Sequence, residues 1–408
     1  MSNPSKRTTL ALLSLATVLG MSPWFSASAV GPSLSALWDL TAAESAWLTM
    51  IVQIGFVAGA LVSAILNTAD RFSPRIVMAG GALTASLATA AVAFLDTGFE
   101  GALVCRFVTG FALAHVYPVA MKVVATWTLE DRGLGIGLIV AAVVAGSASP
   151  HLVRGLGGVE SWRAVLGIVA ALALAGSVLG FIAGHLGPHR SQRPPFRWRH
   201  MTHSFTDRPL RLANLGYLGH MWELYAMWTW IPIFLAASYR AFDPDCDEAT
   251  IQRAASLCTF GAIAMGSFGS YGAGWLADRW GRTRTTMASL IVSGTCALTI
   301  GFFFGMSPWL VTVVAWIWGF AVVADSAQFS SSVSELADPK FVGTQLTTQT
   351  ALGFLLTLAT IRLVPTLEPD LGWRWTFPIL ALGPVIGTWA MWSLKRSPDA
   401  KKLAGGRG

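Results

Sequence analysis

Charged side chains inside long apolar runs are the residues of this sequence best suited to chemistry. Glu223 lies in such a run, between Trp222 and Tyr225. Apolar and aromatic surroundings disfavour the charged form of a carboxylate, which suits uptake and release of a proton. His220 stands three residues earlier, on the same face of a helix. We expect Glu223 and His220 to couple proton movement, with a protonated Glu223 bonded to a neighbouring helix as the structural alternative.

Two further charges interrupt apolar runs, Asp325 and Arg106. A charge within a bilayer is costly and usually functional, so we expect both to face a solute cavity as charge partners, Asp325 also serving proton coupling. The alternatives are a helix-to-helix salt bridge for Asp325 and snorkelling to the interface for Arg106. Aromatic, histidine and amide side chains complete the expected cavity: Trp24, His115, Tyr117, Tyr225, Trp228, Gln328, Gln345 and Gln349.

Enzyme and metal chemistry find no support in the sequence. Motifs such as HExxH or GxSxG are missing, so no catalytic residue is predicted. The four cysteines form no CxxC pair, and the histidines at 185, 189, 200 and 203 lie in a polar stretch without helical ligand spacing. No metal or cofactor is expected. The net charge of +7 is not gathered on a basic face, so no nucleic-acid partner is expected either.

Membrane-spanning helices are the elements that must position these side chains. Of the 408 residues, 54% are hydrophobic and 12% charged, whereas soluble domains carry about 25% charged residues. Runs long enough to cross a bilayer predict an all-α polytopic membrane protein with twelve transmembrane helices. The expected spans are 9–33, 43–67, 75–95, 101–127, 133–154, 162–185, 210–238, 252–277, 284–305, 308–333, 341–365 and 372–394.

The two halves of the chain are faint repeats. Gly110-Phe111-Ala112 recurs as Gly319-Phe320-Ala321, and Trp162-Arg163 recurs as Trp373-Arg374, at nearly equal offsets. By this alignment Asp325 corresponds to Val116. The predicted domains are a six-helix bundle at 1–185, a cytosolic linker at 186–209, a second bundle at 210–394 and a cytosolic tail at 395–408. Parallel repeats of this kind place a solute site at the bilayer midplane and alternate its access.

A loop after the eighth expected span, from Gly274 to Arg282, resembles the signature of the major facilitator superfamily, and a degenerate copy lies in the first half. The resemblance covers nearly the whole chain and implies two pseudo-symmetric six-helix bundles with a cytosolic gate. Gly274 is expected to permit close helix approach, and the acidic residues to favour the state closed to the cytosol. Plain anchoring by positive charge is the alternative. The expected gate residues are Asp70, Arg71, Arg75, Gly274, Asp278, Arg279, Gly281 and Arg282.

Lysine and arginine gather in alternate loops and at both ends, whereas the opposite loops are short and acidic. The positive-inside rule therefore predicts cytosolic termini, in a bacterial inner (plasma) membrane. Membrane lipids, protons and a small-molecule substrate are the expected partners of a monomer.

The sequence favours a proton-coupled secondary transporter working by alternating access, with Arg106 favouring symport of a small organic or inorganic anion. Export of a cationic or amphipathic drug by proton antiport remains the alternative, which the acids and aromatics would suit. In the superfamily that the chain resembles, antiporters often carry Gly-Pro at the position of Ser149-Pro150. This difference weakens the drug-export alternative. A membrane enzyme or a passive channel is less favoured.

Overall fold

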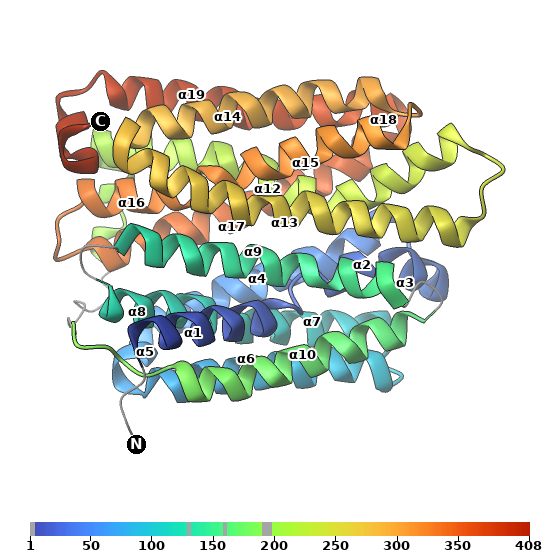
Figure 1. Cartoon of the computed structure of the whole chain (residues 1–408), viewed down its shortest axis with the longest axis horizontal. Coiled ribbons are helices and arrows are strands. Elements are labelled where there is room, and N and C mark those ends of the chain that lie inside the picture. Colours follow the sequence, from blue (N-terminus) through green and yellow to red (C-terminus); the bar gives the residue numbers. More distant parts are fainter. Residues whose placement is uncertain (1–4, 129–131, 158–160, 190–197) are drawn as a thin grey trace. The chain divides into compact units, whose positions relative to one another are not determined.

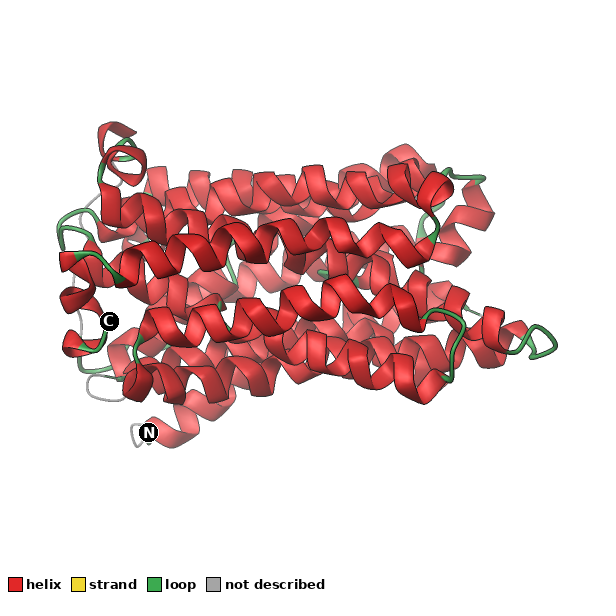
Figure 2. Cartoon of the chain, turned by 90° about the horizontal axis from the view of Figure 1, so that it is seen from above, coloured by secondary structure: helices red, strands yellow, loops and turns green. Residues whose placement is uncertain are grey.

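A computed structural model describes residues 5–128, 132–157, 161–189 and 198–408, without the side chains at 69, 70, 132, 133 and 198 (Figure 1). Helices and their connections make up this part of the chain, which holds no strand. Loops gather mostly at the ends of the long helices (Figure 2). The chain divides into two compact units, Met1–Arg193 and Pro194–Gly408. The boundary between them falls within the stretch expected to be a linker.

The N-terminal unit is a bundle of helices that begin at recognisable capping residues. Thr41 forms a reciprocal capping box with Glu44 at the start of α4, and Ser161 caps α10. The helices are α1 (Lys6–Met21), α2 (Ser26–Ala29), α3 (Gly31–Trp38), α4 (Ala42–Leu66), α5 (Thr68–Arg71), α6 (Pro74–Phe94), α7 (Gly98–Leu113), α8 (Tyr117–Trp127), α9 (Arg132–Gly157) and α10 (Trp162–Ala183).

The C-terminal unit is a second bundle, in which Asp207 and Asp247 cap the two longest helices. Its α-helices are α11 (His203–Thr206), α12 (Arg208–Phe242), α13 (Glu248–Trp280), α14 (Arg282–Thr299), α15 (Pro308–Ala324), α16 (Ser326–Leu336), α17 (Val342–Leu371), α18 (Trp373–Thr376) and α19 (Leu382–Lys395). Short 3₁₀ helices join them: η1 (Trp198–His200), η2 (Ile300–Phe303), η3 (Phe377–Ala381) and η4 (Pro398–Gly406).

Equivalent helices pack in equivalent ways inside the two units. In the N-terminal unit α4 packs on α7, α6 on α10, and α1 on both α9 and α10. In the C-terminal unit the matching pairs are α13 with α15, α14 with α19, and α12 with both α17 and α19. The repeat predicted from short sequence matches is therefore a repeat of packing.

The repeated glycines lie where equivalent helices cross. A Cβ atom on Gly110 of α7 would come within 1.9 Å of the Val52 carbonyl oxygen in α4. A Cβ atom on Gly319 of α15 would come within 1.7 Å of the Ala262 carbonyl oxygen in α13. Only glycine permits this approach of two backbones, which is how membrane helices pack closely.

Among the described residues, nine helical segments are long and apolar enough to cross a membrane. The other three expected crossings are the broken first span and the helices α12 and α13, which are more polar. At 35 and 33 residues, α12 and α13 are long enough to cross a bilayer. Large apolar side chains such as Phe94, Phe268 and Trp309 are exposed, as lipid contact requires. The all-α polytopic fold predicted from the sequence is confirmed.

The expected first span is interrupted, although its sequence reads as one apolar run. Regular helix stops at Met21, and the chain turns through Ser22–Phe25 before α2. Pro23 has no N–H to continue the helical bonding, which accounts for the break. The fourth and tenth spans are also split, at Ala114–Val116 and at Asp325, positions that correspond in the two repeats.

Candidate functional site

Glu223 is buried in the C-terminal unit and holds two hydrogen bonds from neighbouring helices. Its side chain lies on α12 with 0% exposure. Trp318 Nε1 of α15 donates to Oε1 at 2.6 Å, and Ser293 Oγ of α14 donates to Oε2 at 2.9 Å. Neither donor is charged, so the carboxyl group is held without a counter-ion from these two residues.

This arrangement tolerates both protonation states of Glu223. The indole N–H only donates, so Oε1 acts as an acceptor in either state. The Ser293 hydroxyl can donate to a charged Oε2 or accept a hydrogen bond from a protonated one. In the second case its own proton still has an acceptor, since Ser293 Oγ lies 3.2 Å from the Leu290 carbonyl oxygen. A proton can therefore bind or leave without breaking the helix contacts.

His220 and Asp325 form a second buried pair beside Glu223. Nδ1 of His220 lies 2.8 Å from Oδ1 of Asp325, and Nε2 lies 2.9 Å from Oγ of Ser326. His220 and Asp325 are both about 1% exposed. The pair joins α12 to the junction of α15 and α16, the place where the tenth span is split. Asp325 and Glu223 also lie within electrostatic range of each other.

The other predicted cavity residues of this unit divide into two groups. Tyr225 packs its ring against those of Trp228 and Phe354, with centroids 5.6 and 5.1 Å apart. Gln345 and Gln349 instead attach α17 to other segments. Gln345 bonds to Ser204 and donates to the His200 carbonyl at 2.6 Å, while Gln349 donates to Asn214 of α12 at 3.0 Å.

Arg106 is the central charge of the N-terminal unit and is held inside it. Its guanidinium, 2% exposed, donates to the carbonyls of Pro23 (2.8 Å), Trp24 (2.6 Å) and Leu48 (3.2 Å) and to Ser26 Oγ (3.0 Å). The acceptors on Pro23, Trp24 and Ser26 lie at the break in the first span, so Arg106 replaces missing helical donors there, and the Leu48 carbonyl belongs to α4. It does not snorkel. Arg106 and Asp325 thus each have other partners in this conformation.

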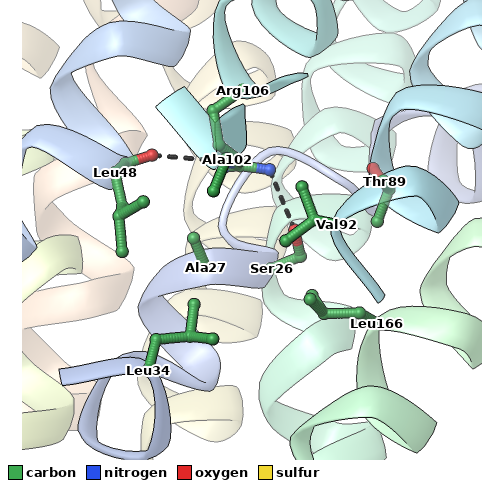
Figure 3. A pocket seen from close by; sticks show the side chains of 9 residues that line it. All are labelled: Ser26, Ala27, Leu34, Leu48, Thr89, Val92, Ala102, Arg106 and Leu166. Atoms are coloured by element: carbon green, nitrogen blue, oxygen red, sulfur yellow. Dashed lines mark hydrogen bonds between the residues drawn. The ribbon is translucent and has the colours of Figure 1, made fainter. Parts of the chain in front are cut away.

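A small pocket lies beside Arg106 (Figure 3). Apolar side chains line most of it, and the polar members are Arg106, Ser26 and Thr89. The remaining predicted residues of this unit take packing roles. Trp24 lies against Phe56 with ring centroids 4.7 Å apart, and Tyr117 packs on the apolar core around α1 and α8. His115, at the split in the fourth span, has Nδ1 3.0 Å from the carbonyl oxygen of Phe111 in α7.

Arg282 is the centre of the predicted gate in the C-terminal unit. It contacts Asp278 at 3.2 Å, Glu335 at 2.8 Å and Gln328 at 2.8 Å. Gln328, which was predicted to line the solute cavity, accepts from Arg282 in this cluster through its amide oxygen. The final residues of the chain pack here too, with Glu335 accepting from the Ala404 amide at 2.9 Å.

Two predicted gate glycines differ in role. Gly281 has φ +97°, and a Cβ atom there would lie 2.2 Å from the Gly408 carbonyl oxygen, so glycine is required. Gly274 was predicted to permit close helix approach, and that is wrong within the described residues. A Cβ atom at Gly274 would meet nothing within 4 Å.

Two of the other three gate arginines lie on aromatic rings. Arg279 stacks on Trp275 at 3.6 Å from the ring centroid, and Arg75 lies over Phe181 at 4.7 Å. Arg71 is exposed at the end of α5. The side chain of Asp70 falls outside the described part of the chain.

Sequence reasoning missed several residues that the structure brings to these sites. Trp318, Ser293 and Glu335 bind predicted residues through bonds between distant helices, and no local pattern marks them. Arg154 was read as the end of a span, yet it is buried and its guanidinium bonds to the carbonyl of Ala29. No group of three or more metal-ligating side chains occurs where the structure can be described.

Comparison with known proteins connects these features to a family. The sequence model of the Major Facilitator Superfamily matches residues 12–361. The niacin transporter NiaP of Acinetobacter baylyi is 27% identical over 314 residues, covering 68% of each chain. The putative niacin/nicotinamide transporter NiaP of Bacillus subtilis is 24% identical over 286 residues, covering 66% of this chain and 64% of its own.

Proposed function

The chain belongs to the major facilitator superfamily of membrane transporters, and from that premise we propose that it carries a small organic anion by proton symport. Nicotinate, a pyridine carboxylate, is the proposed substrate. The names of the two relatives support this choice, and so does the buried Arg106. Uptake across a bacterial plasma membrane, with cytosolic termini and a monomeric carrier, completes the proposal.

The single observation that carries the proton coupling is the site around Glu223. One oxygen of this buried carboxyl group accepts from an indole N–H, and the other faces a hydroxyl that can either donate or accept a hydrogen bond. The group can therefore take up a proton and keep both hydrogen bonds. His220 and Asp325 lie next to it and add a second exchangeable proton. In this mechanism protonation changes the charge inside the C-terminal unit, and that change favours one of the two access states.

Transport into sealed vesicles tests this function. Purified protein in proteoliposomes is expected to concentrate labelled nicotinate when the outside is more acidic, and a protonophore is expected to abolish accumulation. Equilibration without accumulation would indicate a passive route and contradict the proposal.

Proton antiport of cationic drugs is a second candidate, favoured by the acids Glu223 and Asp325 and the neighbouring rings of Tyr225 and Trp228. Drug efflux by antiport requires a proton to enter as the cation leaves, so a more acidic exterior would drive the cation out of the vesicles. The same vesicles loaded with a fluorescent lipophilic cation separate the two functions, because a symporter of anions leaves the cation undisturbed.

A further inference from the structure

A buried histidine of α9 has no hydrogen-bond partner among the described residues. His151 is 0% exposed, and both of its ring nitrogens lack a donor or acceptor. An imidazole always presents at least one N–H, so burying both nitrogens unpaired disfavours the folded state. Such a group in a native structure calls for an explanation, and a missing ligand is one. Neither the proton site nor the gate uses this residue.

A fixed positive charge stands next to His151. Arg154 lies three residues further along the same face of α9 and is 6% exposed. Its guanidinium donates to the carbonyl of Ala29 in α2, which holds the side chain in place. Arg154 is the charge that acts on His151 in this structure. A guanidinium beside an imidazole N–H is a pair of donors suited to an anion.

The same face of α9 is buried along the helix. Val140, Val144 and Ser147 continue the line of His151 and Arg154 at spacings of three and four residues, and all five are buried. Helix α9 packs on α2, the short helix beyond the break that Arg106 stabilises, and Arg154 bonds to Ala29 of that helix (Figure 1). The buried Arg106 and Arg154 therefore both anchor the same broken segment.

We propose that His151 and Arg154 form a recognition site for the carboxylate group of a small organic anion. This inference rests on the proposed function and names the group by which the N-terminal unit holds the solute. Arg154 provides charge and His151 provides a directional hydrogen bond to one carboxylate oxygen. The positive charge of Arg154 would repel a cation, so the site selects against cations. The ring is enclosed in this conformation, and a solute enters when the transporter adopts an open state.

Thermal stabilisation of the purified full-length protein tests the site with named probes. Nicotinate and benzoate supply the carboxylate, and nicotinamide and benzamide are their neutral counterparts. The wild-type protein is expected to melt at higher temperature with the carboxylates, because binding to the folded state stabilises it. His151→Leu removes both nitrogens and is expected to weaken carboxylate affinity about tenfold, with little effect on the amides. His151→Gln retains one hydrogen bond and is expected to recover part of the affinity.

Stability without ligand separates recognition from a structural role. His151→Leu is expected to melt no lower than the wild type, because it removes unpaired polar atoms. His185→Leu, at an exposed histidine of the same unit, is the matched control and is expected to bind the carboxylates normally.

Three results would overturn the inference: carboxylates that do not stabilise the wild type, unchanged carboxylate affinity in His151→Leu, or a less stable His151→Leu that loses all ligands alike. The last would show that an ordered water or a neighbour satisfies the ring. Carboxylate binding through His151 without nicotinate accumulation in vesicles would refute the proposed transport function and leave the site standing.

Discussion

At the scale of the single residue, Glu223 combines burial with partners that accept either protonation state. The Trp318 and Ser293 donors fix the carboxyl group between three helices, so its position does not depend on its charge. A buried acid held by a fixed cation would instead lose its main contact on protonation. This difference makes Glu223 suited to repeated proton exchange.

Replacing Glu223 by glutamine separates coupling from solute movement. The amide oxygen of the Glu223→Gln side chain can still accept from Trp318, and its NH₂ group can donate to Ser293, so the bundle is expected to fold. Proton-driven accumulation of nicotinate in vesicles is expected to disappear, while exchange of internal for external nicotinate continues. Glu248→Gln, which neutralises an exposed carboxylate, is the control. Accumulation at the wild-type rate in Glu223→Gln would exclude this residue from coupling.

The pair of His220 and Asp325 is expected to be energetically coupled. Each single variant, His220→Gln or Asp325→Asn, keeps a hydrogen-bonding group but removes an ionisable one, so each is expected to lose the charge-assisted part of the contact, and the second substitution then costs little more. The double-mutant cycle is expected to give a coupling free energy of about 0.5–3 kcal/mol, measured by unfolding in detergent.

The exposed pair of Arg240 and Glu248 offers a matched comparison for this cycle. Its side chains are 47% and 58% exposed, so its coupling is expected to stay below about 1 kcal/mol. Additive effects of His220→Gln and Asp325→Asn would mean that the 2.8 Å contact contributes nothing.

At the scale of the element, helix crossings were easier to predict than helix interruptions. Gly110 and Gly319 were visible in the sequence as part of a repeated motif, because the close approach of two helix backbones requires glycine at the crossing. The break after Met21 was not predicted, since a span containing Pro23 often continues as a kinked helix. The interruption here is stabilised by Arg106 from α7, and that contact depends on tertiary packing.

Alanine at the two crossing glycines is expected to force equivalent helices apart. Gly110→Ala in α7 and Gly319→Ala in α15 each place a methyl group against a carbonyl of the facing helix. Each is expected to destabilise the protein by about 1–3 kcal/mol, seen as a lower melting temperature.

Two other helical glycines have open space around them and provide controls. A Cβ atom at Gly137 of α9 or Gly272 of α13 would meet no described atom within 4 Å. Alanine there is expected to be neutral or to stabilise by up to about 1 kcal/mol, because alanine favours the helix. Equal melting temperatures for crossing and control variants would argue against close packing at Gly110 and Gly319.

At the scale of the whole molecule, hydropathy and charge alone predicted the class of fold, since a bilayer requires apolar helices of a certain length. They did not predict which polar residues meet. Glu223 finds Ser293 and Trp318 across 70 and 95 residues, and these distances in sequence carry no periodic signal. Gln328 and Gln345 were assigned to a cavity by residue type, and their bonds with Arg282 and Ser204 could not be read from the sequence.

The predicted orientation can be tested with a native cysteine. Cys246 lies in the loop between α12 and α13, on the side opposite to both termini if the positive-inside rule holds. A membrane-impermeant maleimide added to intact cells is expected to label Cys246. A cysteine introduced by Ser397→Cys, after α19, is expected to react only after permeabilisation. Cys246→Ser gives the background from the other thiols.

The pH dependence of this labelling has a definite sign. Burial raises the pKa of the Cys246 thiol above its ordinary value, and the carboxylates of Asp243 and Asp247 add to the shift. Maleimide reacts with the thiolate, so labelling at neutral pH is expected to be slower than for a free cysteine and to accelerate as pH rises toward the raised pKa. Asp243→Asn with Asp247→Asn lowers that pKa and should speed labelling at neutral pH. Labelling of Cys246 only after permeabilisation would reverse the orientation and place both termini outside.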